Sequence, residues 1–231
     1  MTVEASVASL RRYPVKSMAG EGLGRVALNA RGLVGDRWYA VEDAEGHFAS
    51  GKSTRRFRRH DAVFEYAART ADEQRVIVTG TEGTWTVGDP ALDAVLSAAM
   101  ATPVSVTPER EVAHQDMGQV SLVSTATLAW CERTWGITAD PRRLRVNLVV
   151  KAETPFVEEQ WVGKDLLIGS ARLRVVERTP RCRMIDIDQD GARADGRWLK
   201  ELAAERDHCI AVYADVTAAG EIAVGDQISV G

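Results

Sequence analysis

Apolar and polar residues alternate with a period of two along many short stretches of this chain. Successive side chains of a β-strand point to opposite faces, so this period predicts strands that are half buried. Turn residues separate the stretches at short intervals, which favours a barrel or a sandwich over a doubly wound sheet. We expect strands over residues 6–10, 24–28, 37–42, 75–79, 84–87, 104–107, 120–124, 145–151, 164–169, 171–177, 184–188, 209–216 and 221–230.

The last two of these strands are expected to form a hairpin around Gly220. Three other segments have helical period: residues 90–100, 125–135 and 196–206. Asp89 is a suitable N-cap for the first helix, and Pro90 fits its first turn. Gly136 follows the second helix as a stop signal, and that helix places Cys131 on its apolar face.

The chain is therefore predicted to be mainly β with a few helices, an α+β protein. The first helix is followed by Ala101, Thr102 and Pro103, which form the best candidate for a domain boundary. We expect a smaller β-rich region over residues 1–101 and a second domain, a β-barrel, over residues 102–231.

Composition narrows the class of protein. The 231 residues are 45% hydrophobic and 27% charged, as is ordinary for a soluble globular protein. The net charge of −4 gives no electrostatic basis for binding nucleic acid. No signal peptide pattern opens the chain, and no apolar run approaches the ~20 residues of a membrane span. The three cysteines are irregularly spaced, which suits a reducing compartment. We expect a cytoplasmic protein that does not bind a membrane.

Residues 46–53 read GHFASGKS and fit the phosphate-binding motif G-x-x-x-x-G-K-[ST]. That motif binds phosphate only between a buried strand and a helix whose N–H groups face the phosphate. The preceding strand is half polar and leads to a hairpin turn at residues 43–46, and residues 54–60 offer a poor apolar helix face. We therefore predict a hairpin and no nucleotide site. The basic residues that follow form either a solvated surface or a local anion site: Lys52, Arg55, Arg56, Arg58 and Arg59.

Cys182 is the strongest candidate for chemistry. It follows a predicted strand and lies between Arg181 and Arg183. Neighbouring cations stabilise a thiolate over a thiol, and the thiolate is both the nucleophile and the metal ligand. The alternative for such a cysteine is a small apolar residue of the core. A turn signal at residues 188–191 closes the segment.

Other polar residues fall at the expected ends of strands. Lys16 and Ser17 follow Pro14, which cannot donate to a ladder and so ends the first strand. Arg145 and Asn147 alternate with apolar residues, and a period of two would place both on one strand face. The four histidines are scattered with no spacing typical of a zinc site.

Taken in order, several segments resemble one known family. They are residues 13–17 (YPVKS), 35–38 (GDRW), 121–124 (SLVS), 145–147 (RVN), 164–169 (KDLLIG) and 181–182 (RC) followed by 188–191 (DQDG). The chain resembles MOSC domain proteins, named after the C-terminal domain of molybdenum cofactor sulfurase, together with the β-barrel region that often precedes that domain. The resemblance covers nearly the whole chain and is closest to the amidoxime-reducing members.

The resemblance implies a bound molybdenum–molybdopterin cofactor, with the thiolate of Cys182 as a ligand of the metal; pyridoxal phosphate is not expected. A soft thiolate suits such a metal, and Lys and Arg suit the pterin phosphate. The positions that match cofactor-contacting residues of relatives are Lys16, Ser17, Arg37, Asp116, Ser124, Arg145, Asn147 and Arg181.

The activity implied by the resemblance is the reduction of N-hydroxylated or N-oxide small molecules. The electrons would come from a separate flavin or iron–sulfur reductase, because no cysteine-rich segment of this chain could hold a cluster. Two alternatives stay open. Cys182 could carry a persulfide for sulfur transfer, or the chain could be a cofactor carrier without turnover.

Overall fold

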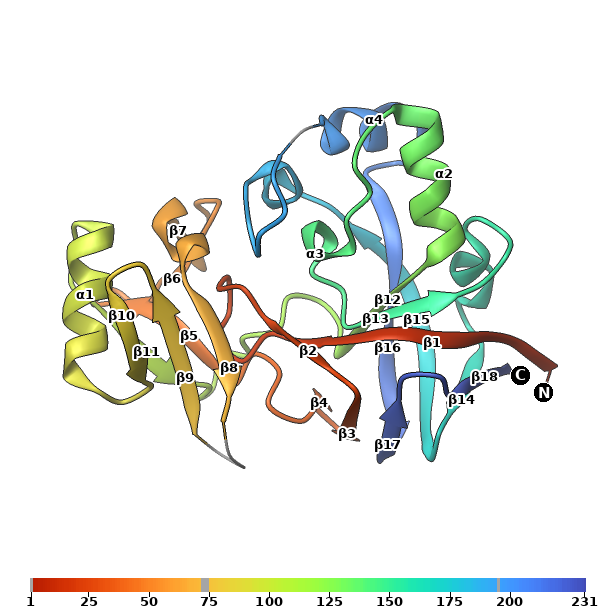
Figure 1. Cartoon of the computed structure of the whole chain (residues 1–231), viewed down its shortest axis with the longest axis horizontal. Coiled ribbons are helices and arrows are strands. Elements are labelled where there is room, and N and C mark those ends of the chain that lie inside the picture. The colour runs from red at the N-terminus through yellow and green to blue at the C-terminus, as the bar shows by residue number, and fades with distance from the viewer. Residues whose placement is uncertain (1, 72–74, 195) are drawn as a thin grey trace.

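The computed structural model of the protein describes residues 2–71, 75–194 and 196–231, arranged in two lobes (Figure 1). The larger lobe holds a β-barrel with helices over one end. We call the smaller body, built from β5 to β11 with α1, the N-terminal lobe. The prediction of a mainly β protein with a few helices and a barrel is confirmed.

The barrel is closed by seven strands in the order β13-β12-β16-β15-β14-β18-β1, with β1 pairing back to β13. Their bounds are β1 (Thr2–Arg12), β12 (Val120–Ser124), β13 (Leu148–Lys151), β14 (Asp165–Ile168), β15 (Ala171–Pro180), β16 (Cys209–Ala218) and β18 (Gln227–Val230). The predicted alternation is seen in β15, which buries Ala171, Leu173 and Val175 and exposes the residues between them. Aliphatic side chains fill the interior, with Trp161 at its edge.

Short strands extend the barrel at its lower side in Figure 1. The strand β2 (Glu21–Leu23) pairs with β1. The strands β17 (Gly220–Ala223), β3 (Arg25–Asn29) and β4 (Gly32–Leu33) form a small separate sheet. The predicted hairpin around Gly220 is therefore wrong, because β17 pairs with β3 and β16 pairs with β12 and β15.

The N-terminal lobe contains two open sheets. One has the order β11-β5-β6-β7 and the other β10-β9-β8. Their bounds are β5 (Tyr39–Asp43), β6 (Phe48–Ser50), β7 (Phe57–Arg59), β8 (Ala67–Thr70), β9 (Val76–Gly80), β10 (Gly83–Thr86) and β11 (Val104–Pro108). The helix α1 (Pro90–Met100) packs Leu92 and Leu96 into the core of this lobe.

The sequence signals for helix ends are confirmed. The Asp89 carboxylate accepts the N–H of Ala91 at 2.9 Å at the start of α1. The helix α2 (Thr125–Trp135) ends at Gly136, whose φ of 64° lies in the left-handed region. Cys131 lies on the buried face of α2 and is fully buried, as its position on the apolar face predicts.

The other helical segments are short. They are α3 (Pro141–Leu144), α4 (Trp198–Glu205) and the 3-10 helices η1 (Asp61–Glu65), η2 (Val157–Trp161) and η3 (Arg183–Asp186). Two strand predictions are corrected by them. Residues 184–188 fall largely in η3, and residues 145–147 precede β13 because Arg145 ends α3 with a left-handed backbone. Among the described residues, no helix has the length and apolar character required to cross a membrane.

The phosphate-loop match at residues 46–53 is a hairpin. Strand β6 lies inside the motif and pairs with β5, and the segment after it leads to β7. A phosphate loop requires a helix directly after the motif, and a strand follows instead. The division of the chain at residue 101 stays a prediction. The sheets exchange strands across that point, since β1 belongs to the barrel and β11 to the N-terminal lobe.

Candidate functional site

A cavity of about 380 Å³ is lined by residues of the N-terminal lobe and by residues near the ends of barrel strands. Its lining is strongly cationic. Seven lysine and arginine residues face it against one acid, Asp116: Lys16, Arg37, Lys52, Arg56, Arg143, Arg145 and Arg181. The whole chain has a net charge of −4, so this concentration of positive charge is local. A cleft lined by one sign of charge attracts ligands of the opposite sign.

The structure brings together most of the residues singled out from the sequence. The cavity is lined by Lys16, Ser17, Arg37, Asp116, Arg145, Asn147, Arg181 and Cys182. Ser124 is not among the lining residues. Its hydroxyl accepts the N–H of Thr127 at 3.1 Å and caps α2, which accounts for its burial without a ligand.

Three of the lining residues have a left-handed backbone. The φ angles of Ser17, Arg37 and Arg145 are 71°, 53° and 50°. Residues other than glycine rarely adopt this region, and such strain gathers at ligand sites where the surrounding structure holds it in place. All three lie outside the strands: Ser17 and Arg37 are turn residues, and Arg145 ends α3.

The Tyr13 ring packs against three arginine guanidiniums. The guanidinium carbons of Arg145, Arg37 and Arg11 lie 4.2, 5.0 and 5.8 Å from its ring centroid. Burial raises the pKa of Tyr13 to about 12, so its hydroxyl stays protonated and adds no negative charge. The ring therefore holds the guanidiniums through its π face without neutralising them.

Arg145 and Arg181 are cations without a counter-ion. Arg145 donates to the carbonyl oxygen of Met18 at 2.8 Å, and Arg181 donates to those of Leu144 and Ile210 at 2.8–3.1 Å. Neither forms a salt bridge with any described residue. Burial lowers the pKa of both groups. Buried charge is costly unless it is paired, so this arrangement favours an anionic ligand.

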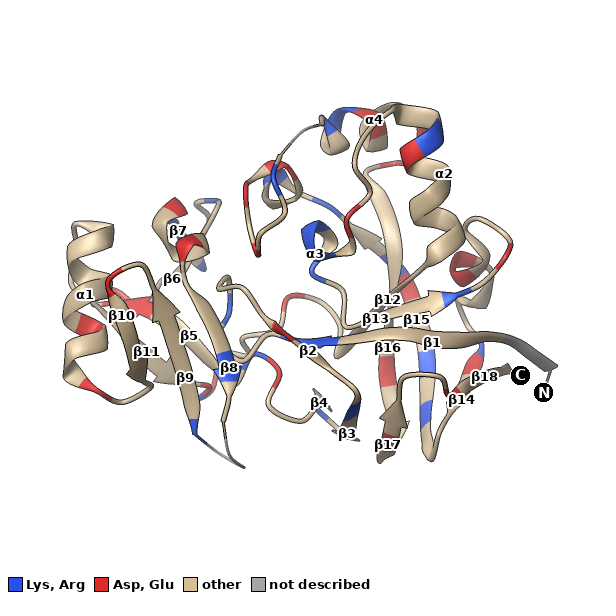
Figure 2. Ribbon diagram, in the orientation of Figure 1, with Lys and Arg blue, Asp and Glu red and all other residues tan. Residues whose placement is uncertain are grey.

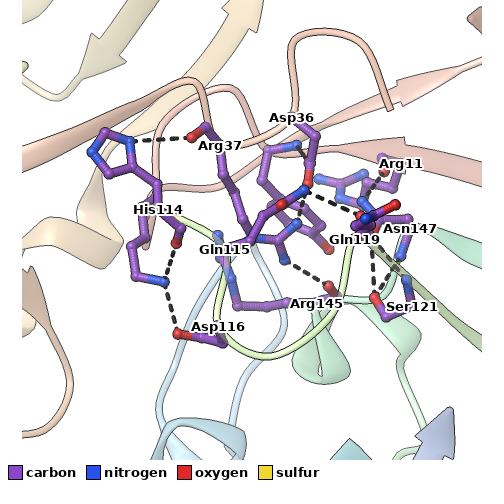
Figure 3. Close-up of polar contacts among 12 residues, drawn as sticks. Arg11, Asp36, Arg37, His114, Gln115, Asp116, Gln119, Ser121, Arg145 and Asn147 are labelled. Atoms are coloured by element: carbon purple, nitrogen blue, oxygen red, sulfur yellow. Dashed lines mark hydrogen bonds and ion pairs between the residues drawn. The ribbon is translucent and has the colours of Figure 1, made fainter. Parts of the chain in front are cut away.

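Arg37, labelled with its partner Asp36 in Figure 3, and Lys16 have acidic partners by contrast. The Arg37 guanidinium pairs with Asp36 and reaches the carbonyl oxygen of Arg145 at 3.2 Å. The Lys16 Nζ donates to Asp116 at 2.9 Å and to the carbonyl oxygen of His114 at 2.6 Å. Burial lowers the pKa of Lys16 to about 8 against the opposing effect of Asp116. Lys16 is nevertheless mostly charged at neutral pH.

Asn147 is fixed in one orientation. Its Oδ1 accepts the N–H and the hydroxyl of Ser121, each at 3.1 Å, and its Nδ2 donates to the carbonyl oxygen of Arg11 at 3.3 Å (Figure 3). The prediction that Arg145 and Asn147 share a strand face is wrong, because both precede β13. They reach the same cavity through the turn between α3 and β13.

Cys182 lies between the end of β15 and the start of η3, with its free thiol partly exposed. The residues around it offer few other metal ligands. In the described parts of the chain, no group of three or more His, Cys, Asp or Glu side chains could hold a metal ion. A metal at this thiol would have to arrive with most of its ligands already in place.

Several lining residues escaped the sequence reasoning. Lys52 and Arg56 belong to the basic cluster that was predicted only as a surface or local anion site, and both face the cavity. Arg143 and Tyr213 carried no motif. Arg143 donates to the carbonyl oxygen of Ala192 at 3.2 Å, and burial raises the pKa of Tyr213. Their positions depend on the three-dimensional pairing of distant strands, which no local pattern reveals.

Family models match both parts of the chain. The MOSC domain matches residues 109–229, and the MOSC N-terminal beta barrel domain matches residues 4–78. The chain belongs to the MOSC domain family. The resemblance described from the sequence is therefore confirmed, and the cavity lies where residues of the two matched regions meet.

The curated relatives share only low sequence identity with this chain. The molybdenum cofactor sulfurase of Danio rerio is 25% identical over 83% of this chain and 29% of its own length. The mitochondrial amidoxime reducing component 2 of Bos taurus is 26% identical over 51% of this chain and 38% of its own length. The chain thus aligns with about a third of each relative. Among solved structures, the YUAD protein of Bacillus subtilis has a TM-score of 0.51 at 14% identity, covering 98% of this chain and 94% of that one. That likeness concerns the fold.

Proposed function

We propose that this MOSC protein binds the molybdenum cofactor through Cys182 and the cationic cavity, and that it reduces N-hydroxylated or N-oxide small molecules. The observation that carries the proposal is that a free, partly exposed thiol shares the cavity with the guanidiniums of Arg145, which is buried, and Arg181, which is half-buried; neither has a counter-ion among the described residues. The thiol suits a soft metal, and the guanidiniums suit an anionic phosphate.

The lining residues fit a metal that is carried by an organic cofactor. One thiolate is too few ligands for a bare ion, whereas a metal held by its own organic ligands needs little more from the protein. Arg145, Arg181 and Lys16 would hold the anionic part of the cofactor, and the fixed amide of Asn147 would present its remaining hydrogen-bonding capacity to the pterin. When bound, the cofactor supplies the two-electron redox chemistry.

The proposed reaction requires one external electron donor. Reduction of an amidoxime breaks its N–O bond, consumes two electrons and two protons, and releases an amidine and water. We propose that the electrons come from a separate flavin or iron–sulfur reductase. The cavity residues orient the substrate beside the thiol-bearing turn, and the buried cations keep the site positively charged while electrons enter.

The test is molybdenum and pterin content of protein from a host that makes the cofactor. Wild type and Cys209→Ala are expected to carry stoichiometric metal, since Cys209 is a second partly exposed cysteine and does not line the cavity. Cys182→Ala is expected to lose the metal and reductase activity. Full metal content and full activity in Cys182→Ala would refute the ligand role.

Sulfur transfer is the second candidate, because the sulfurase of Danio rerio aligns over most of this chain. In that case Cys182 would carry a persulfide within the cationic cavity. Wild-type protein without molybdenum, but with a persulfide on Cys182 detected by mass spectrometry, would favour this function. A cofactor carrier would instead bind the pterin and reduce no substrate with any artificial electron donor.

A further inference from the structure

Lys52, Arg56 and Phe57 form a second cluster on the N-terminal side of the cavity, which contains neither Arg145 nor Arg181 and borders on Lys16. The cations of this cluster lie close to the aromatic ring of Phe57. The Nζ atoms of Lys52 and Lys16 lie 5.0 and 5.1 Å from the ring centroid, and the guanidinium carbon of Arg56 lies 5.1 Å from it. Three cations therefore surround one buried aromatic ring.

Two of these cations are uncompensated. Lys16 is paired with Asp116, so that pair carries little net charge. Lys52 makes no hydrogen bond or ion pair with a described residue. Arg56 donates through Nη2 to the carbonyl oxygens of Ala113 and Gln115, the latter at 2.9 Å, and its charge has no salt-bridge partner among the described residues. The cluster thus has donors left for an anion.

The cluster is adjacent to the thiol-bearing turn. Arg183 directly follows Cys182 and donates to the carbonyl oxygen of Gly51 at 2.5 Å. Ser50 also approaches Met184, with its hydroxyl 3.3 Å from the sulfur atom. These contacts join the residues before Lys52 to the residues after Cys182. A molecule that presents its reacting group to the thiol can therefore reach Lys52 with another part.

We infer that Lys52 and Arg56 are a specificity subsite for a carboxylate on the substrate, with Phe57 beneath the substrate's apolar part. The inference rests on the proposed reductase function and narrows it to N-hydroxylated compounds that bear an acidic group. Arg145 and Arg181 would bind the anionic part of the cofactor, and Lys52 and Arg56 would bind the carboxylate of the substrate. Each anion therefore has its own pair of cations.

The experiment compares two probes, N-hydroxybenzamidine and its para-carboxylate. Wild type is expected to favour the carboxylate in kcat/KM. In the double variant Lys52→Ala/Arg56→Ala the ratio of the two kcat/KM values should fall by at least roughly tenfold, as expected for lost charge-assisted hydrogen bonds. Arg55→Ala is the matched control, because it removes an exposed cation of the same loop that does not line the cavity; its ratio should stay at the wild-type value.

A binding measurement separates the two proposals. Calorimetric titration with 4-carboxybenzamidine, the product, is expected to show binding to wild type and to Arg55→Ala, and binding at least roughly tenfold weaker to the double variant. If wild type reduces neither probe but shows this binding pattern, the subsite stands and the reductase function falls.

Two results would overturn the subsite. One is unchanged discrimination and unchanged binding in the double variant. The other is loss of molybdenum and pterin from the double variant while Arg55→Ala keeps both, which would assign Lys52 and Arg56 to the cofactor. Circular dichroism of each variant checks that the fold is intact, and the single variants Lys52→Gln and Arg56→Gln replace the double variant if it does not fold.

Discussion

The barrel lobe and the N-terminal lobe line the same cavity in different ways. The barrel side supplies Cys182 together with Arg145 and Arg181. The guanidiniums of these arginines donate hydrogen bonds to backbone carbonyl oxygens, which hold them in place. The N-terminal side supplies Lys52 and Arg56, which are half-buried and form no salt bridge with a described residue. A closed sheet has no edges and a continuous core, whereas two small open sheets leave loops to vary. On the two proposals made above, the barrel would hold the group that does the chemistry and the N-terminal lobe would select the substrate. Figure 2 shows how basic and acidic residues are distributed over the elements of both lobes.

The largest effect is expected from matched core truncations, one in each lobe. Leu122 is fully buried in the barrel, and Leu96 is fully buried on the inner face of α1. Each change to Ala should lower the free energy of unfolding by about 2–5 kcal/mol. Hydrogen exchange should show faster opening over the whole barrel for Leu122→Ala, and faster opening confined to β5–β11 for Leu96→Ala. Equal and global effects of both changes would show that the lobes unfold as one unit.

The next effect tests the buried cations of the barrel side. Inorganic pyrophosphate should raise the melting temperature of the cofactor-free wild-type protein, because a ligand that binds only the folded state stabilises it. Arg145→Ala removes a buried guanidinium without a salt bridge, so the rise should be largely lost, with affinity at least about tenfold weaker. Arg55→Ala should keep the wild-type response. A full response in Arg145→Ala would remove this residue from the anion site.

A buried acid of the barrel side gives a smaller effect that depends on pH. Glu158 is fully buried; one carboxylate oxygen accepts the N–H of Ser124 at 3.1 Å, and the other has no hydrogen-bond partner. Burial raises the pKa of Glu158 in the folded protein. The folded state therefore holds this proton more tightly than the unfolded state does, and stability falls as pH rises from about 4.3 through the raised pKa.

Glu158→Gln removes that titration. We expect the variant to be more stable than wild type near neutral pH, by about 1–2 kcal/mol, and to have a flatter profile of stability against pH. Urea denaturation between pH 4 and pH 8 measures the effect. A wild-type slope that is retained in Glu158→Gln would assign the titration to another group.

The smallest effect concerns Lys16, whose pKa is lowered to about 8. Lys16 loses its positive charge as pH rises through this value, while a bound anion favours the charged form. Affinity for pyrophosphate should therefore decline above about pH 8, by roughly tenfold at most. Lys16→Arg should bind with less dependence on pH in this range, because arginine keeps its charge. The same decline in both proteins would exclude Lys16 as its source.

Much of the fold follows from local sequence patterns. The period of two locates β15, and the caps at Asp89 and Gly136 define helix ends, because these signals depend only on neighbouring residues. The pairing of β17 with β3 could not be inferred, since a hairpin and a distant partner satisfy the same alternation. The 3-10 helix η3 reads as a strand because four residues are too few to show a helical period.

The residues of the candidate site, too, could be predicted from the sequence only in part. Cys182 is found from its flanking arginines, and Lys16 and Arg37 from the family resemblance. Lys52 could not be separated from Arg55, because only the folded connection between β6 and β7 turns one cation into the cavity and the other to solvent. Ser124 matches a family position in sequence, but here its hydroxyl is already used at the start of α2.

The closure of the barrel by β1 has a consequence for biosynthesis. This strand precedes every other strand of the barrel along the chain, yet its two neighbours in the barrel are β13 and β18, and Thr2 pairs with Val230. During synthesis, β1 cannot complete its pairing within the barrel until both β13 and β18 have been made. Such distant pairing makes folding slow and leaves an unpaired edge exposed meanwhile. The sheets of the N-terminal lobe join only residues 39–108, so this lobe can fold before the barrel closes. Less of the chain then stays unfolded while β1 lacks its barrel partners.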